Sequence, residues 1–176
     1  MTTTCKIITS FTLLTLLAVI GACDRQTKRS QPNKDEPIEL DGLQYDTAAI
    51  TVIPYESGGD NYPFSTGYAP TTLTESDIND IENIFKKCVS DYNASLDQDH
   101  RDFIIDLDKN SYKKQLAPGK NSKGEKVVWV NCLCRVHDQS WKTRIYSVED
   151  GGNCYFHFKV NLQTKEYYDL IVNGEA

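Results

Sequence analysis

The spacing of apolar side chains predicts one long helix in this chain. Between residues 75 and 93 apolar positions recur every three or four residues, which indicates an amphipathic helix with one buried stripe. Thr74 is a good N-cap residue, and acidic residues follow it in the first turn, where they favour the positive end of the helix dipole. The stripe consists of Ile78, Ile81, Phe85, Cys88 and Tyr92.

Apolar and polar residues alternate in much of the remaining chain, which predicts strands. The candidate strands cover residues 45–55, 102–107, 111–116, 126–136, 141–148, 154–162 and 166–173. The first ends at a proline, which places it near a sheet edge. Turn residues at 150–153 and 163–165 predict two adjacent hairpins. One helix followed by hairpins predicts an α+β fold, with the helix packed on a four- to five-stranded antiparallel sheet.

The first 22 residues differ in kind from the rest. A lysine is followed by an apolar run from Ile7 to Ile20, which is too short to cross a bilayer, since that takes about 20 residues. It has the length of the apolar region of an export signal, which ends in small residues before the cleavage site. Here Gly21 and Ala22 stand directly before Cys23.

This arrangement resembles the lipobox of bacterial lipoproteins. The resemblance implies that residues 1–22 are a signal peptide cleaved before Cys23. It also implies that the Cys23 thiol carries a diacylglyceryl group and the new amino terminus an acyl chain, which together hold the protein on a membrane of the cell envelope. Whether this is the inner or the outer membrane stays open. The alternative is an ordinary secretory signal in which Cys23 has no role.

The mature chain divides into a tether and one domain. Residues 23–44 are polar, charged and proline-containing, so they predict a flexible tether between lipid and domain. Residues 45–176 have the size of a single domain with one core. Without the leader the chain has 18 basic and 25 acidic residues, a net charge of −7, which argues against nucleic acid as a partner.

A strand, one long helix and then antiparallel strands resemble the cystatin-like layout, in which a sheet wraps one helix. Residues 45–176 are also similar to small uncharacterised Gram-negative lipoproteins with a WVNC-x-C strand and a GGNCYF hairpin, which bring no known activity. Gln115 and Gly119 match the Q-x-V-x-G inhibitory loop of cystatins, with Ala117 in place of the valine. That match implies inhibition of cysteine proteases as an alternative function, whereas Pro118-Gly119 is also ordinary turn chemistry.

Four cysteines remain after Cys5 leaves with the leader and Cys23 takes lipid: Cys88, Cys132, Cys134 and Cys154. An even number in an exported chain favours disulfides. The periodicity places all four toward one core, so Cys88 can pair with Cys132 or Cys134, and the remaining strand cysteine with Cys154. Free buried thiols are the first alternative. A metal site that includes His137 and His157 is the second, although its spacing matches no common zinc pattern.

The chain contains none of the common catalytic or cofactor-binding motifs. We therefore expect a non-enzymatic module without a cofactor, which binds a protein or a small ligand. Its candidate surface is a set of aromatic side chains on the outward strand faces: Trp129, Tyr155, and either Tyr167 or Tyr168. Cover by the loop at residues 62–64 would explain these aromatic residues equally well.

Overall fold

The computed structural model describes residues 45–56, 63–64 and 66–174, all within one compact unit. The predicted signal peptide (1–22), the lipidation residue Cys23 and the tether (23–44) lie outside the described residues. Among the described residues, no helix has the length and apolar character needed to span a membrane.

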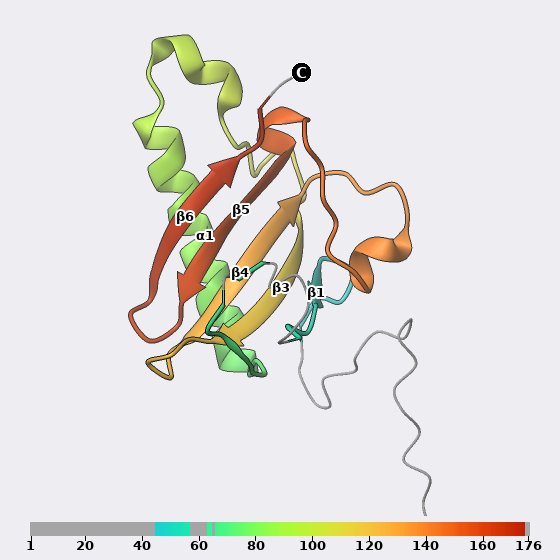
Figure 1. The fold of residues 1–176 in the computed structure, drawn as a ribbon. Coiled ribbons are helices and arrows are strands. Elements are labelled where there is room, and N and C mark those ends of the chain that lie inside the picture. Colours follow the sequence, from blue (N-terminus) through green and yellow to red (C-terminus); the bar gives the residue numbers. More distant parts are fainter. Residues whose placement is uncertain (1–44, 57–62, 65, 175–176) are drawn as a thin grey trace, which may run out of the picture. The chain divides into compact units, whose positions relative to one another are not determined.

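The predicted α+β class is confirmed, with one long helix and an open sheet of six strands (Figure 1). The strands are β1 (Ile50–Val52), β2 (Ala69–Pro70), β3 (Lys113–Lys120), β4 (Lys126–Leu133), β5 (Tyr155–Asn161) and β6 (Glu166–Val172). Their order is β1-β3-β4-β5-β6, and β2 also pairs with β3. All pairs are antiparallel except β1 with β3. This parallel pair, which we did not predict, needs a long crossover, and the connection contains the helix.

The helix α1 (Glu75–Ser95) begins with a capping box. The Thr74 side chain accepts a hydrogen bond from the Asp77 amide, and the Asp77 carboxylate accepts one from the Thr74 amide. The helix lies on one face of the sheet, here called the helix face (Figure 1). The predicted stripe packs there. Adjacent strands supply this face with Leu116, Val130 and Phe158, which are paired in register. These side chains form the main core.

The opposite face of the sheet, here called the second face, is covered over only part of its width. Tyr55 and Phe64, from the chain between β1 and β2, pack with Trp129 of β4. The segment between β4 and β5, which contains the short helix η2 (Gln139–Lys142), also crosses this face, with Trp141 buried. Along β5 the second-face positions are half-buried while the helix-face positions are fully buried. The cover is therefore most complete over β3 and β4, and it reaches β6 where the side chain of Tyr68, the residue before β2, is hydrogen-bonded to Tyr168.

Two predicted strands, 102–107 and 141–148, are wrong. Each lies in an irregular segment, with η1 (Gln98–Phe103) in the first and η2 in the second. The backbone of Ile105 exchanges two hydrogen bonds of 2.9 Å with the side-chain amide of Asn93. The Asn93 side chain thus takes the hydrogen bonds that a neighbouring strand would otherwise make with Ile105. The predicted hairpin of 141–148 with 154–162 is also wrong, because β5 pairs with β4 and β6.

The turn predicted at Pro118-Gly119 is likewise wrong, because both residues belong to β3. The Leu116 carbonyl faces β1, where it accepts from the Ile53 amide. Since strand residues two apart point the same way, Pro118 also faces that outer edge, where a missing N–H breaks no hydrogen bond to β4. The turn instead lies at residues 121–125 and contains Gly124, whose φ is +82°.

Candidate functional site

The predicted aromatic surface is not a single surface. Trp129 is 2% exposed and packs in the cluster that contains Phe64, so loop cover, the alternative explanation, holds for it. Tyr167 lies on the helix face, where its hydroxyl donates to Asp91 over 2.8 Å. Tyr155 is half-buried on the second face. Tyr168 lies on that same face and is 37% exposed.

The less covered half of the second face belongs to β5 and β6. Its side chains, here called the open face, are Tyr155, His157, Lys159, Tyr168 and Ile171. His157 pairs in register with Ile171, and Lys159 with Tyr168, so each pair stands side by side on the sheet. Ile171 is 54% exposed, which is high for an isoleucine. Sequence reasoning did not place Ile171 on this face, because a register shift in β6 interrupts the simple alternation of side chains.

That register shift occurs at Asp169, a non-glycine residue with a φ of +53°. Such a conformation is uncommon and marks a bulge, which disturbs the free edge of β6 and discourages another strand from pairing there. The Asp169 carboxylate lies 2.9 Å from the Lys159 ammonium. The one cation of the open face is therefore paired with an anion.

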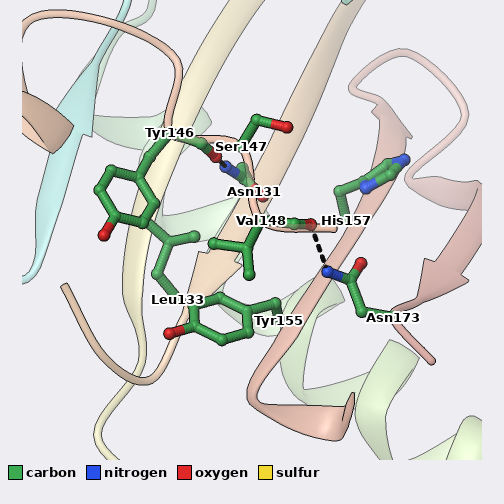
Figure 2. Close-up of a pocket in the computed structure, with 8 residues that line it drawn as sticks. All are labelled: Asn131, Leu133, Tyr146, Ser147, Val148, Tyr155, His157 and Asn173. Carbon is green, nitrogen blue, oxygen red and sulfur yellow. Dashed lines mark hydrogen bonds between the residues drawn. The ribbon is translucent and has the colours of Figure 1, made fainter. Parts of the chain in front are cut away.

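A pocket of about 60 Å³ lies between the open face and residues 146–148 (Figure 2). It is lined by Asn131, Leu133, Tyr146, Ser147, Val148, Tyr155, His157 and Asn173. One wall is the segment after η2, and the other side consists of β4, β5 and the residue after β6. Sequence reasoning did not predict this pocket, because it had assigned the wall to a strand.

Side-chain amides hold the pocket wall in place. Asn131 donates to the Tyr146 carbonyl over 2.9 Å, and Asn173 donates to the Val148 carbonyl over 2.6 Å (Figure 2). Beneath them, the fully buried Gln115 donates to the carbonyls of Trp141 and Arg144 and accepts from the Tyr146 amide. These hydrogen bonds attach the wall to the sheet.

His157 is the titratable side chain of the pocket whose charge state matters near neutral pH. Burial, and then the positive charge of Lys159, lower the pKa of His157 below its ordinary value of 6.5. The imidazole is therefore neutral at pH 7. Its ring centroid lies 5.4 Å from that of Trp129. Within the described chain, no carboxylate or nucleophile is hydrogen-bonded to this histidine.

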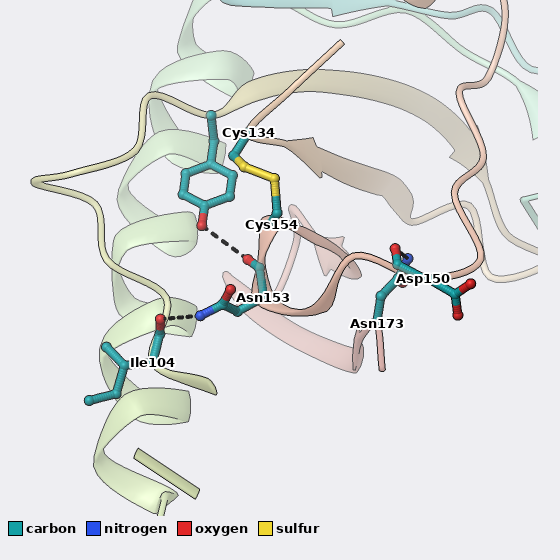
Figure 3. The surroundings of a disulfide bond; sticks show 7 residues. Ile104, Cys134, Asp150, Asn153, Cys154 and Asn173 are labelled. Atoms are coloured by element: carbon teal, nitrogen blue, oxygen red, sulfur yellow. Dashed lines mark hydrogen bonds between the residues drawn. A yellow bond between two sulfur atoms is a disulfide. The ribbon is translucent and has the colours of Figure 1, made fainter. Parts of the chain in front are cut away.

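A disulfide joins Cys134 to Cys154 beside the pocket, one of the pairings that the sequence left open (Figure 3). Their Cα atoms are 5.0 Å apart, and the Cys134 amide donates to the Cys154 carbonyl over 2.9 Å. The pocket residues Leu133 and Tyr155 are the immediate neighbours of these cysteines. The bridge thus fixes the two strand ends that form the pocket floor.

Asn153, the residue before Cys154, is hydrogen-bonded to the chain between α1 and β3. The side chain of Asn153 donates to the Ile104 carbonyl over 2.6 Å, and its own carbonyl accepts from the Tyr112 hydroxyl over 3.0 Å (Figure 3). The irregular chain after α1 is therefore held against the disulfide end of β5.

The expected helix-to-sheet bridge is not formed, because Cys88 and Cys132 are free thiols. Both are fully buried in the main core. Burial raises the pKa of Cys88 to about 12, with a further contribution from Asp91, and burial raises the pKa of Cys132 as well. Among the described residues, no three His, Cys, Asp or Glu side chains group as metal ligands.

The residues that match the cystatin motif are not exposed. Gln115 is fully buried and bonded to its neighbours, and a Cβ atom at Gly119 would lie 2.8 Å from the Phe64 ring. Neither residue can therefore reach the active site of a protease in this conformation. Inhibition of cysteine proteases stays a prediction, for which a papain assay is the direct test.

The site thus consists of a fixed, uncharged pocket beside an open face with exposed apolar and aromatic side chains. No protein-family model, curated protein or solved structure matches this chain significantly. Its function has to be argued from its own residues.

Proposed function

We propose that this protein is a lipid-anchored lipoprotein of the cell envelope, and that its domain binds a protein or small ligand through the open face without catalysis. The anchor is proposed from the apolar leader that ends at Gly21, Ala22 and Cys23. The binding role is proposed from the structure of the second face.

One observation carries the binding role. The chain covers its own sheet over β3 and β4 but leaves Tyr168 and Ile171 of β6 37% and 54% exposed. Exposed apolar side chains that adjoin one another and a pocket are typical of interaction sites. The absence of catalysis is proposed because Lys159 is paired with Asp169 and because His157 has no hydrogen-bonded catalytic partner among the described residues.

The anchor is tested by replacing Cys23 with alanine in the full chain, with Cys5→Ala as the matched control in the same leader. Wild type and Cys5→Ala partition into detergent, and mass spectrometry finds a lipidated amino terminus at position 23. Cys23→Ala remains in the aqueous phase. Detergent partitioning by Cys23→Ala would refute the anchor without affecting the binding proposal.

The open face is tested by placing a photoreactive amino acid at position 171. The matched control carries the same group at Lys86, an exposed position on α1, which packs on the opposite face of the sheet. In envelope preparations, position 171 cross-links to a discrete species that an excess of unlabelled protein competes away, and position 86 does not. Equal cross-linking at both positions, or none at 171, contradicts the proposal.

A further inference from the structure

The lining of the pocket has an unusual charge balance. It contains two carboxamides, two phenols, a hydroxyl and an imidazole, yet no carboxylate, ammonium or guanidinium. The imidazole of His157 is neutral at pH 7, since burial and Lys159 both lower its pKa. Lys159 itself is paired with Asp169. An ion that entered this pocket would lose its water shell without gaining a counter-charge, which is costly. The pocket therefore selects an uncharged group.

The two carboxamides define the polar part of that group. The nitrogen of Asn131 donates to Gln115 and to the Tyr146 carbonyl, and the nitrogen of Asn173 donates to the carbonyls of Val148 and Asp150. Among the described residues nothing donates to the oxygen of either amide. Each oxygen can therefore accept a hydrogen bond from a ligand, so the pocket favours a neutral hydrogen-bond donor, such as an N–H group.

The remaining lining and the volume define the rest of the group. Leu133 and Val148 offer apolar contact, which suits a methyl group beside the N–H donor. The volume of about 60 Å³ exceeds the roughly 10–15 Å³ that one water needs and is far below the roughly 300–1,000 Å³ of pockets for drug-sized ligands. An acetamido group combines these features, because it is small and neutral, with one N–H donor and one methyl.

We propose that the pocket receives the acetamido group of an N-acetylated amino sugar, whose ring lies on the open face over His157 and Ile171. This inference rests on the proposed function and names the ligand class of the same site. A sugar suits the surroundings because its C–H groups pack on the exposed Ile171 while its hydroxyls meet the imidazole. An acetylated lysine carries the same acetamido group on an alkyl chain without hydroxyls, and the probes below distinguish it from the sugar.

The test uses the full-length chain in detergent and saturation-transfer NMR with small probes. We expect saturation to pass from the protein to the acetyl methyl protons of N-acetylglucosamine. Glucose lacks the acetamido group, glucosamine is a cation and acetate is an anion of similar shape to acetamide, so none of the three gives a saturable signal. Signals of equal strength from N-acetylglucosamine and glucosamine, or no signal from N-acetylglucosamine, overturn the inference.

A matched pair of variants locates the binding. Val148→Trp fills the pocket and leaves the carbonyl bond from Asn173 in place, whereas Thr164→Trp adds the same ring at an exposed turn. We expect N-acetylglucosamine to bind Val148→Trp at least about tenfold more weakly than wild type, a loss of about 1.4 kcal/mol in binding free energy. Its affinity for Thr164→Trp should equal that for wild type. Unchanged affinity in Val148→Trp overturns the pocket assignment.

Two further results separate this inference from the proposed function. Transfer to an acetyl-lysine probe, with none to N-acetylglucosamine, refutes the sugar as the ligand class. Specific cross-linking from position 171 together with no sugar binding refutes the inference and leaves the open face as a binding surface.

Discussion

At the scale of single residues, side-chain amides supply many of the hydrogen bonds that hold irregular chain against the helix and the sheet. The amides in these positions are Asn93, Gln115, Asn131, Asn153 and Asn173. Each can donate and accept at once, so each can satisfy a backbone N–H and a carbonyl that have no strand partner. Buried backbone groups left without such partners would cost free energy.

Gln115 is the most heavily bonded of these residues, so its loss has a predictable effect on stability. Gln115→Ala leaves the carbonyls of Trp141 and Arg144 and the Tyr146 amide without these partners. We expect a loss of about 2–4 kcal/mol in the free energy of unfolding, measured by urea denaturation. The control Gln163→Ala removes an exposed amide and should change it by less than about 0.5 kcal/mol. Equal stability of the two variants would refute the role of this network.

The free thiols lead to a second prediction at this scale. Cys88 and Cys132 are fully buried, and burial raises the pKa of both, so neither is a thiolate at pH 8. We expect alkylation at pH 8 to leave both unmodified in the folded protein and to modify both in denaturant, as measured by peptide mass spectrometry. Modification of either thiol in the folded protein at the denatured rate would show that the core opens readily.

At the scale of elements, the start of α1 depends on one carboxylate. Asp77 closes the capping box and lies 2.6 Å from the Lys126 ammonium on β4, so it joins the helix to the sheet. Burial raises the pKa of Asp77, but the hydrogen bonds from Lys126 and Thr74 outweigh it, and the net pKa is lowered. The ionised form is therefore favoured in the folded protein.

The sign of the pH effect follows from that lowered pKa. The stabilisation is complete above the ordinary value of 3.8 and is lost as the pH falls through the folded value. At pH 7, Asp77→Asn should lower the free energy of unfolding by about 1 kcal/mol, and Glu75→Gln in the same turn by at most about 0.5 kcal/mol. Urea denaturation should show the difference between wild type and Asp77→Asn shrinking below pH 3.8. A constant difference would contradict this assignment.

The elements with clear periodicity were predictable from sequence. The helical stripe around Ile81 and the alternation along β4 and β5 place apolar side chains on one face, and the core contains them. The segments 102–107 and 141–148 have similar short apolar runs. These segments do not form strands, because their backbone groups are hydrogen-bonded to the side-chain amides of distant residues such as Asn93 and Gln115. No local pattern records those contacts.

At the scale of the whole molecule, the candidate site was only partly predictable, for a related reason. Sequence alternation identified Tyr155 as a second-face residue, but it could not show that Phe64 covers Trp129. The bulge at Asp169 moved Tyr168 and Ile171 onto the open face. The pocket arises where a long connection returns over the sheet, so it depends on tertiary contacts alone.

The uneven cover of the second face should also be visible in the stability of the strands. β4 is paired on both sides and packed on both faces, whereas β6 is an edge strand with an open face and a bulge. Amides that open only with the whole domain exchange slowest, and those near exposed edges exchange faster by local opening. We therefore expect hydrogen exchange of the intact chain to rank the strands with β4 slowest and β6 fastest among β3–β6. Added N-acetylglucosamine should slow exchange in β5 and β6 more than in β3, because only the former border the pocket and the open face. Equal protection of β4 and β6 without ligand would mean that the exposed half of the sheet is covered in solution, and it would remove the surface on which the binding proposal stands.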